Sequence, residues 1–302
     1  MPISTKIIKR RIKSVANTRK ITKAMELVAG AKMRKAVRLT LLSRDYARSI
    51  QTLTDNIRRR IAPHAHPLLA GPMVSAMSLV IVASSDKGLC GSFNSQILKQ
   101  AFEFLHTRSE SIQVVTVGKR AEQSVKRAGY SILAAFEAIS GAPSFERTRP
   151  VGALVYNEFM SGKADRVFIV FMDFKNAVIQ TPITQQLLPI IPERELLNVM
   201  PVPSWTLKDM EVTDESDAQV LFEPNPASIL DLLLPRLIET RIYQALLESS
   251  ASEHSARMLA MQNATENATE MLEDLAFTFN QARQATITRE ISEISAGKAA
   301  IA

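Results

Sequence analysis

The chain has 302 residues, of which 46% are hydrophobic and 22% are charged, and its formal net charge is +7 at pH 7. This composition excludes a disordered, collagen-like or disulfide-rich chain and is sufficient for a substantial core. The single cysteine, Cys90, cannot form an internal disulfide, which is typical of a reducing compartment. We expect neither a membrane-spanning segment nor a secretory signal, because no long apolar stretch is present.

The charge is distributed unevenly along the chain. Residues 1–60 contain 17 Lys and Arg against three acidic residues, whereas residues 208–302 contain 7 against 16. Two explanations remain open at this point. Either the two ends of the chain pair with each other, or the basic end binds an acidic partner such as nucleic acid.

The first segment predicts one long helix. Residues 3–60 contain no proline and a single glycine, and their apolar residues recur mostly at steps of three or four. A helix of about 55 residues is roughly 80 Å long and needs a partner along much of its length. Pro63, Pro67 and Pro72 are expected to end it. The predicted seam consists of Ile8, Ile12, Val15, Ile21, Met25, Val28, Leu42, Tyr46, Ile50, Leu53, Ile57 and Ile61.

In the middle of the chain, short apolar runs alternate with helical stretches. This alternation predicts an α/β domain with a largely parallel sheet, whose last two strands form a hairpin near Lys175 and Asn176. The expected strands are 79–83, 112–117, 132–136, 167–174 and 177–188, and the expected helices are 94–106, 119–127 and 145–160.

The last segment is helical again. Residues 236–296 lack proline and glycine, and Pro235 is expected to break or restart the helix. Opposite charges on the two ends favour a long antiparallel coiled coil of the N- and C-terminal helices, with the α/β domain inserted between them. The predicted organisation is an N-terminal helix over 1–62, an α/β domain over 73–190, an irregular connection over 191–226 and a C-terminal helix over 227–302.

The residues themselves predict no catalytic, cofactor or metal site. The loop 84–92 follows a strand and precedes a helix, but it has neither the dinucleotide fingerprint nor the Walker A spacing. Its glycines favour a tight turn. Cys90 lies near a helix N-terminus, which lowers a thiol pKa, yet no histidine is near it in sequence. His64 and His66 have a possible metal-ligand spacing, although an exposed turn is the favoured interpretation.

The basic helix between Lys6 and Arg38 suggests phosphate binding as an alternative function. Its basic residues surround the whole helix, however, and do not form one groove-facing stripe. A positive helix that faces solvent or protein is therefore favoured over a nucleic-acid-binding one.

Three separated segments resemble one known family. Residues 12–29 read IKSVANTRKITKAMELVA, residues 84–94 read SSDKGLCGSFN, and the C-terminal segments are ASEHSARM at 251–258 and NQARQATITREI at 280–291. In this order they are similar to the signatures of the F-type ATP synthase gamma subunit. One departure is Ser92, which stands where the family often has a second glycine.

The resemblance implies a central-stalk rotor of a proton-translocating ATP synthase. The coiled coil would lie inside a ring of three alpha and three beta subunits, and the α/β domain would contact the epsilon subunit and the c-ring. Rotation of the c-ring would then drive ATP synthesis on the beta subunits. The chain itself would be non-catalytic, would need no cofactor and would bind no nucleic acid. We expect it to be peripheral, at the cytoplasmic face of the bacterial plasma membrane.

The resemblance also implies a set of rotor–stator contact and coupling residues. By motif, Met25 corresponds to the family methionine that faces an acidic beta-subunit loop. The other members of the set are Arg257, Gln284, Thr288 and Glu290. Coiled-coil packing or solvation is the alternative interpretation of each.

Overall fold

The structure, a computed structural model, describes residues 5–58, 66–69, 77–108, 110–191, 203 and 226–301. The chain divides into two compact units. Met1–Ala29 with Met258–Ala302 form one, called the helical unit below, and Gly30–Arg257 form the other, called the α/β unit. His64, Pro63, Pro72 and most of the predicted connection 191–226 lie outside the described residues.

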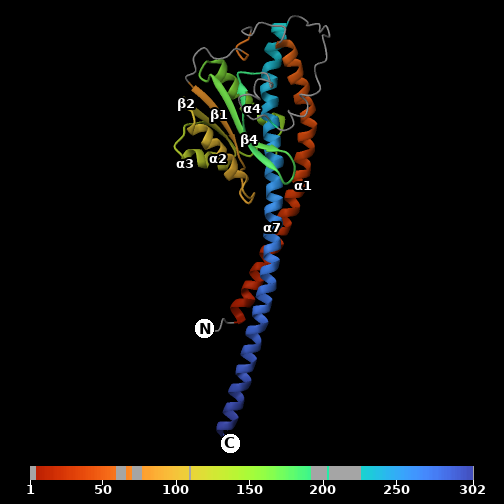
Figure 1. The fold of residues 1–302 in the computed structure, drawn as a ribbon, viewed down its shortest axis with the longest axis vertical. Coiled ribbons are helices and arrows are strands. Elements are labelled where there is room, and N and C mark those ends of the chain that lie inside the picture. Colours follow the sequence, from red (N-terminus) through yellow and green to blue (C-terminus); the bar gives the residue numbers. More distant parts are fainter. Residues whose placement is uncertain are drawn as a thin grey trace. The chain divides into compact units, whose positions relative to one another are not determined.

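One sheet forms the centre of the α/β unit (Figure 1). Its strands are β1 (Met77–Ala83), β2 (Ser111–Val117), β3 (Ile132–Phe136), β4 (Arg166–Phe174) and β5 (Gln180–Leu188). The order across the sheet is β3-β2-β1-β4-β5. The first four strands in this order are parallel, and β5 pairs antiparallel with β4. The predicted largely parallel sheet and its closing hairpin are confirmed.

Helices cover both faces of this sheet. Val80 and Val82 of β1 pack in one cluster with α2 (Phe93–His106) and α3 (Lys119–Arg127). Their neighbours Leu79 and Ile81 point to the opposite face, because side chains alternate along a strand. On that face they join a cluster with α4 (Phe145–Met160) and with parts of α1 (Thr5–Arg58) and α7 (Pro226–Ile301). Burial on both faces explains why the central strands are continuous apolar runs.

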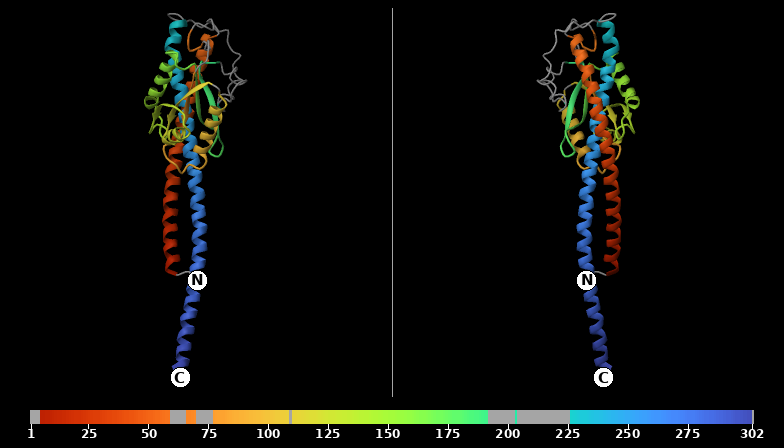
Figure 2. Two further views of the ribbon diagram at one scale, coloured as in Figure 1. Left: turned by 90° about the vertical axis from the view of Figure 1, so that its left-hand side faces the viewer. Right: turned by 90° about the vertical axis from the view of Figure 1, so that its right-hand side faces the viewer.

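The two long helices are antiparallel. In the α/β unit, Arg44 of α1 pairs with Glu248 of α7, and Gln51, further along α1, accepts a hydrogen bond from Arg241, which comes earlier in α7. In the helical unit, Thr265 Oγ1 donates to Thr22 Oγ1 across 2.8 Å, and Figure 2 shows α1 and α7 side by side. The predicted antiparallel pairing of the N- and C-terminal helices is therefore confirmed.

The predicted seam of α1 is only partly confirmed, because Ile8, Ile50 and Ile57 are buried but other members are exposed. Leu42 and Tyr46, two of its large members, are 65% and 51% exposed. The buried face of α1 in the α/β unit instead consists mostly of small and β-branched side chains. Small residues let two helix backbones approach closely, and Leu42 and Tyr46 lie outside the contact, whereas Ile50 and Ile57 join the core. The buried residues are Gly30, Ala36, Thr40, Ala47, Ile50, Gln51, Thr54 and Ile57.

Pro235 neither breaks nor restarts the last helix, since α7 is continuous through it. A proline inside a helix costs about 3 kcal/mol, because it removes one backbone donor and its ring crowds the preceding turn. Leu234, Leu237 and Ile238 lie beside it and are almost fully buried in the core. Burial of each such side chain contributes about 1.5–3 kcal/mol, which offsets the cost. Within the described part of the chain, no helix has a stretch long and apolar enough for a bilayer span.

Candidate functional site

The loop 84–92 begins at the carboxyl end of β1, and its own side chains fix its shape. Ser85 Oγ lies 2.7 Å from the Lys87 carbonyl oxygen and 2.9 Å from Asn94 Oδ1, and its single proton can be donated to either acceptor. Asn94 Nδ2 in turn donates to Cys90 Sγ at 3.2 Å. Gly91 has φ +55°, a conformation that favours glycine, so the predicted tight turn is present there. Ser92 stands where the family that the sequence resembles often has glycine. Its φ is −85°, so the serine causes no backbone strain there.

The thiol of Cys90 is not activated by the helix N-terminus. It is 2% exposed, and burial raises its pKa, with smaller opposing contributions from Ser85 and Arg257. At neutral pH it is therefore a protonated, buried group. His66 is also buried, not exposed as expected, and its Nδ1 accepts the Leu68 N–H at 3.1 Å. Among the described residues, no cluster of three or more His, Cys, Asp or Glu side chains is suited to a metal ion.

Two side chains of the loop 84–92, Ser84 and Asp86, accept hydrogen bonds from the segments that follow β2 and β3. Ser84 Oγ accepts the Ala121 N–H at 2.6 Å, in the first turn of α3. Asp86 Oδ1 accepts the Lys119 N–H at 3.2 Å, and its Oδ2 accepts from Ser140 Oγ at 3.0 Å. Free N–H groups at a helix start bind oxygen acceptors, and a carboxylate also suits the helix dipole. These bonds join the loops that follow β1, β2 and β3.

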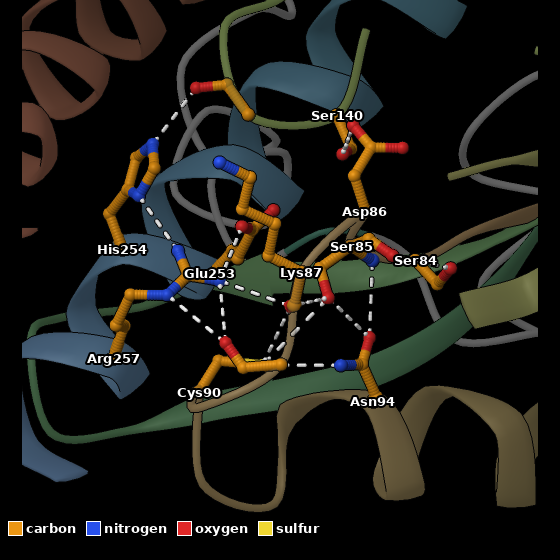
Figure 3. A network of polar contacts seen from close by, with 12 residues as sticks. Ser84, Ser85, Asp86, Lys87, Cys90, Asn94, Ser140, Glu253, His254 and Arg257 are labelled. Atoms are coloured by element: carbon orange, nitrogen blue, oxygen red, sulfur yellow. Dashed lines mark hydrogen bonds and ion pairs between the residues drawn. The ribbon is translucent and has the colours of Figure 1, made fainter. Parts of the chain in front are cut away.

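One turn of α7 also contacts the loop 84–92 (Figure 3). Arg257 Nη2 lies 2.8 Å from Glu253 Oε1, and the two side chains are only 12% and 5% exposed. The same guanidinium donates to the Lys87 carbonyl at 3.2 Å and to the Gly88 carbonyl at 3.3 Å. Burial raises the pKa of Glu253, and the charge of Arg257 opposes this shift.

His254 extends the network to the loop between β3 and α4. Its Nε2 lies 2.9 Å from the Gly141 carbonyl, and its Nδ1 lies 3.3 Å from Arg257 Nη1. A carbonyl can only accept a hydrogen bond, so Nε2 carries the proton. A guanidinium can only donate, so Nδ1 is the acceptor. Burial lowers the pKa of this imidazole, and the ring is neutral at pH 7.

Ser255 binds a third loop from the same helical turn. Its Oγ donates to the Ala177 carbonyl at 2.6 Å, in the hairpin between β4 and β5. Residues 253–257 of α7, called the 253–257 clasp below, therefore contact loops that follow β1, β3 and β4. The order of the sheet reverses between β1 and β4, which is where open α/β sheets commonly bind ligands. Here side chains of the chain's own helix α7 contact the loops at that edge, and Arg257, His254 and Ser255 each bond to a carbonyl of a different loop.

The residues implied by the resemblance are distributed over both units. Met25 is half-buried on α1 in the helical unit, and Gln284, Thr288 and Glu290 are exposed on α7. Gln284 and Thr288 are four residues apart and share one face of the helix. Arg257 belongs to the α/β unit and to the clasp. Their contacts with other subunits stay predictions.

Most residues of the clasp were not predicted from the sequence. Glu253, His254 and Ser255 were not assigned any function, although they belong to the segment 251–258 that carries the resemblance. The available signal was that this segment and the segment 84–94 both match one family. The structure shows the reason these segments belong together, because their residues are in direct contact.

Comparisons with known proteins give the same result over the whole chain. A family model described as ATP synthase matches residues 4–301. The ATP synthase gamma chain of Pelotomaculum thermopropionicum is 36% identical over 298 residues, which cover 99% of each chain. That of Heliobacterium modesticaldum is 39% identical over 296 residues, covering 97% of this chain and 98% of its own.

Two solved structures with the same fold are parts of mitochondrial ATP synthases. A chain of the Tetrahymena thermophila central stalk and c-ring structure aligns with TM-score 0.57 and 25% identity, over 81% of this chain and 99% of its own length. A chain in a Euglena gracilis structure of OSCP, F1 and c-ring aligns with TM-score 0.63 and 18% identity, over 98% of this chain and 94% of its own. The full-length match to gamma chains, together with the paired long helices and the inserted α/β sheet, shows that this chain belongs to the ATP synthase gamma chain family.

Proposed function

We propose that this chain is the central-stalk rotor of a proton-translocating F-type ATP synthase, and that it couples c-ring rotation to ATP synthesis. The observation that carries the proposal is its similarity to gamma chains along 99% of its length, both long helices included. The chain itself is non-catalytic, and ATP forms on the beta subunits. Its proposed partners are three alpha and three beta subunits, the epsilon subunit and the c-ring, and not nucleic acid. The proposed location is peripheral, at the cytoplasmic face of the bacterial plasma membrane.

The surface of the helical unit supports a role inside a larger assembly. Beyond residue 282, α7 is exposed on all sides up to residue 296, and it continues past the N-terminal end of α1 (Figure 2). A long helix without a packing partner is marginal in water. Ile287, Ile291 and Ile294 are 46%, 59% and 73% exposed on this segment. An exposed apolar surface of this kind is typical of a protein-binding site.

We extend the proposal to the residues implied by family resemblance. Met25, Gln284, Thr288 and Glu290 are rotor–stator contact and coupling residues, and Arg257, the fifth residue implied by the resemblance, is a coupling residue. Exposure of Gln284, Thr288 and Glu290 on α7 leaves their side chains available to a surrounding subunit. The functional division follows the predicted segments, with 1–62 and 227–302 as the shaft and 73–190 as the domain nearest the c-ring.

Reconstitution with alpha and beta subunits tests the rotor function. We expect the purified chain to hydrolyse no ATP alone and to rotate in one direction when the alpha–beta hexamer hydrolyses ATP. A bead attached through Lys99→Cys, whose side chain is 77% exposed on α2, reports this rotation. The same assembly without ATP is the control. ATP hydrolysis by the chain alone, or a hexamer that never turns the bead, would overturn the proposal.

A variant of Gln284 tests the residue assignment separately. Gln284→Ala removes an exposed amide that the proposal places against the stator, so we expect ATP-driven proton pumping per ATP hydrolysed to fall while assembly is retained. Thr278→Ala is the control, since it is also exposed on α7 but belongs to no assigned contact. Equal pumping in both variants would remove Gln284 from the contact set.

A further inference from the structure

We infer that the 253–257 clasp is the joint that fixes the α/β sheet to α7 against twisting, and that Arg257 is its central positioning residue. The inference rests on the proposed rotor function, because a shaft that transmits torque needs a joint that resists rotation about its own axis. It differs from the role that the resemblance implies for Arg257. The residue acts within the rotor and holds the loop 84–92, instead of contacting the stator.

The geometry of the clasp suits a joint that resists twisting. Three side chains from one turn of α7 bind backbone carbonyls of Gly88, Gly141 and Ala177, which belong to three different loops. A single attachment would allow the helix to turn about it. Attachments to three separated loops instead define a plane, so a twist of α7 must stretch at least one hydrogen bond.

The apolar contacts between α7 and the sheet are less directional. Between Leu234 and Leu246, α7 packs against the sheet through buried apolar side chains such as Leu237 and Ile242. Apolar burial contributes much of the stability but has no preferred direction. Hydrogen bonds weaken steeply when their angle or length departs from the optimum. The clasp therefore supplies directional stiffness that the apolar contact lacks.

Arg257 is suited to the central position because of the fork of its guanidinium. Its donors contact the Glu253 carboxylate, His254 Nδ1 and the Lys87 and Gly88 carbonyls together. With a side chain only 12% exposed, most of this group is used inside the α/β unit. Bonds in which one partner is charged are stronger than neutral ones, and a lysine ammonium cannot reproduce the planar fork.

The test uses Arg257→Lys in the assembled enzyme in native membranes. Lysine keeps the charge beside Glu253 and loses the fork, so we expect assembly and ATP hydrolysis to remain and proton pumping per ATP to fall. We also expect amide hydrogen exchange in the loop 84–92 to accelerate about tenfold for each charge-assisted bond lost. Arg236→Lys is the matched control, because this arginine is half-exposed on the same helix and contacts neither loop 84–92 nor Gly141.

The two readouts separate the joint from a stator contact. Lower pumping with unchanged exchange in the loop 84–92 would assign Arg257 to the stator and overturn the joint. Unchanged pumping would overturn it as well, whatever the exchange. The exchange readout needs no rotation, so it still reports on the clasp if the proposed rotor function fails.

Ser255→Ala keeps the inference testable if Arg257→Lys does not assemble. It removes only the bond to the Ala177 carbonyl and leaves the Arg257 contacts in place. We expect faster exchange confined to the hairpin that contains Ala177 and a smaller loss of pumping per ATP. Wild-type pumping in this variant would overturn the three-loop joint.

Discussion

Replacing Glu248 by glutamine should remove a pH-dependent loss of stability from the α/β unit. The Glu248 side chain is fully buried on α7, where Arg44 binds both carboxylate oxygens at 2.9 and 3.0 Å and Gln244 donates to one of them. Burial is the largest influence and raises its pKa to about 7, helped by the charge of Asp173 and opposed by Arg44. The ordinary value of such a carboxyl is 4.5.

The sign of the effect follows from proton binding. Between pH 4.5 and about 7, folded Glu248 holds a proton that the unfolded chain has lost. Its contribution to the free energy of unfolding is therefore fully present below pH 4.5 and is lost as the pH rises through about 7. The difference between the two pKa values corresponds to about 3 kcal/mol. Glutamine does not titrate, so the variant should gain that amount relative to the wild type between pH 4.5 and 8.

Urea unfolding followed by circular dichroism at several pH values measures this difference. Comparing each variant with the wild type at the same pH cancels the titration of all other groups. Glu273→Gln, at an exposed position of the same helix, is the control and should give a curve parallel to the wild type. A Glu248→Gln curve that also stays parallel would refute the argument that burial of this carboxyl raises its pKa.

Three further substitutions, two of them with a control variant, test how the site and the helix beside it are held. Gly118→Ala should cost more than about 3 kcal/mol in thermal or urea unfolding, because its Cβ would lie 2.3 Å from the Ser84 carbonyl oxygen at φ +92°. Gly129→Ala, at φ +81° with open space around it, should cost only about 1–2 kcal/mol, and equal costs would contradict the clash. Ser84→Ala should cost about 1–3 kcal/mol in the same assay, because it leaves a buried N–H of α3 unpaired, and a neutral result would show that this bond is not needed. Ile97→Ala should cost about 2–5 kcal/mol by opening a cavity under α2, whereas Lys99→Ala on its exposed face should be nearly neutral.

Local periodicity was sufficient to predict the elements of the sheet. The apolar run at residues 79–83 corresponds to β1 because a strand covered on both faces needs apolar residues at every position. The helix 119–127 was predicted with its observed bounds, and the hairpin near Lys175 was predicted from two adjacent strand patterns. Each of these features depends on neighbours within a few residues.

Packing between distant segments overrode the local rules elsewhere. Pro235 was expected to interrupt α7, but the buried leucines beside it keep the helix continuous. The large apolar side chains Leu42 and Tyr46 were placed in the helix contact, yet the contact is formed by smaller residues such as Ala47. Neither outcome can be read from spacing alone, because it depends on how closely the second helix approaches.

The sequence by itself determined the order of the elements, the pairing of the two terminal helices and the family. These depend on periodicity and on motifs that are contiguous in the chain. Only the tertiary structure decided that Arg257 contacts Gly88, which is 169 residues away, and that His254 and Ser255 bind two further loops. The physical reason is that every residue has a backbone carbonyl, so hydrogen bonds to carbonyls do not restrict the residue types of the accepting loops. The clasp becomes visible only when the sheet topology brings those loops to one edge, next to a single turn of α7.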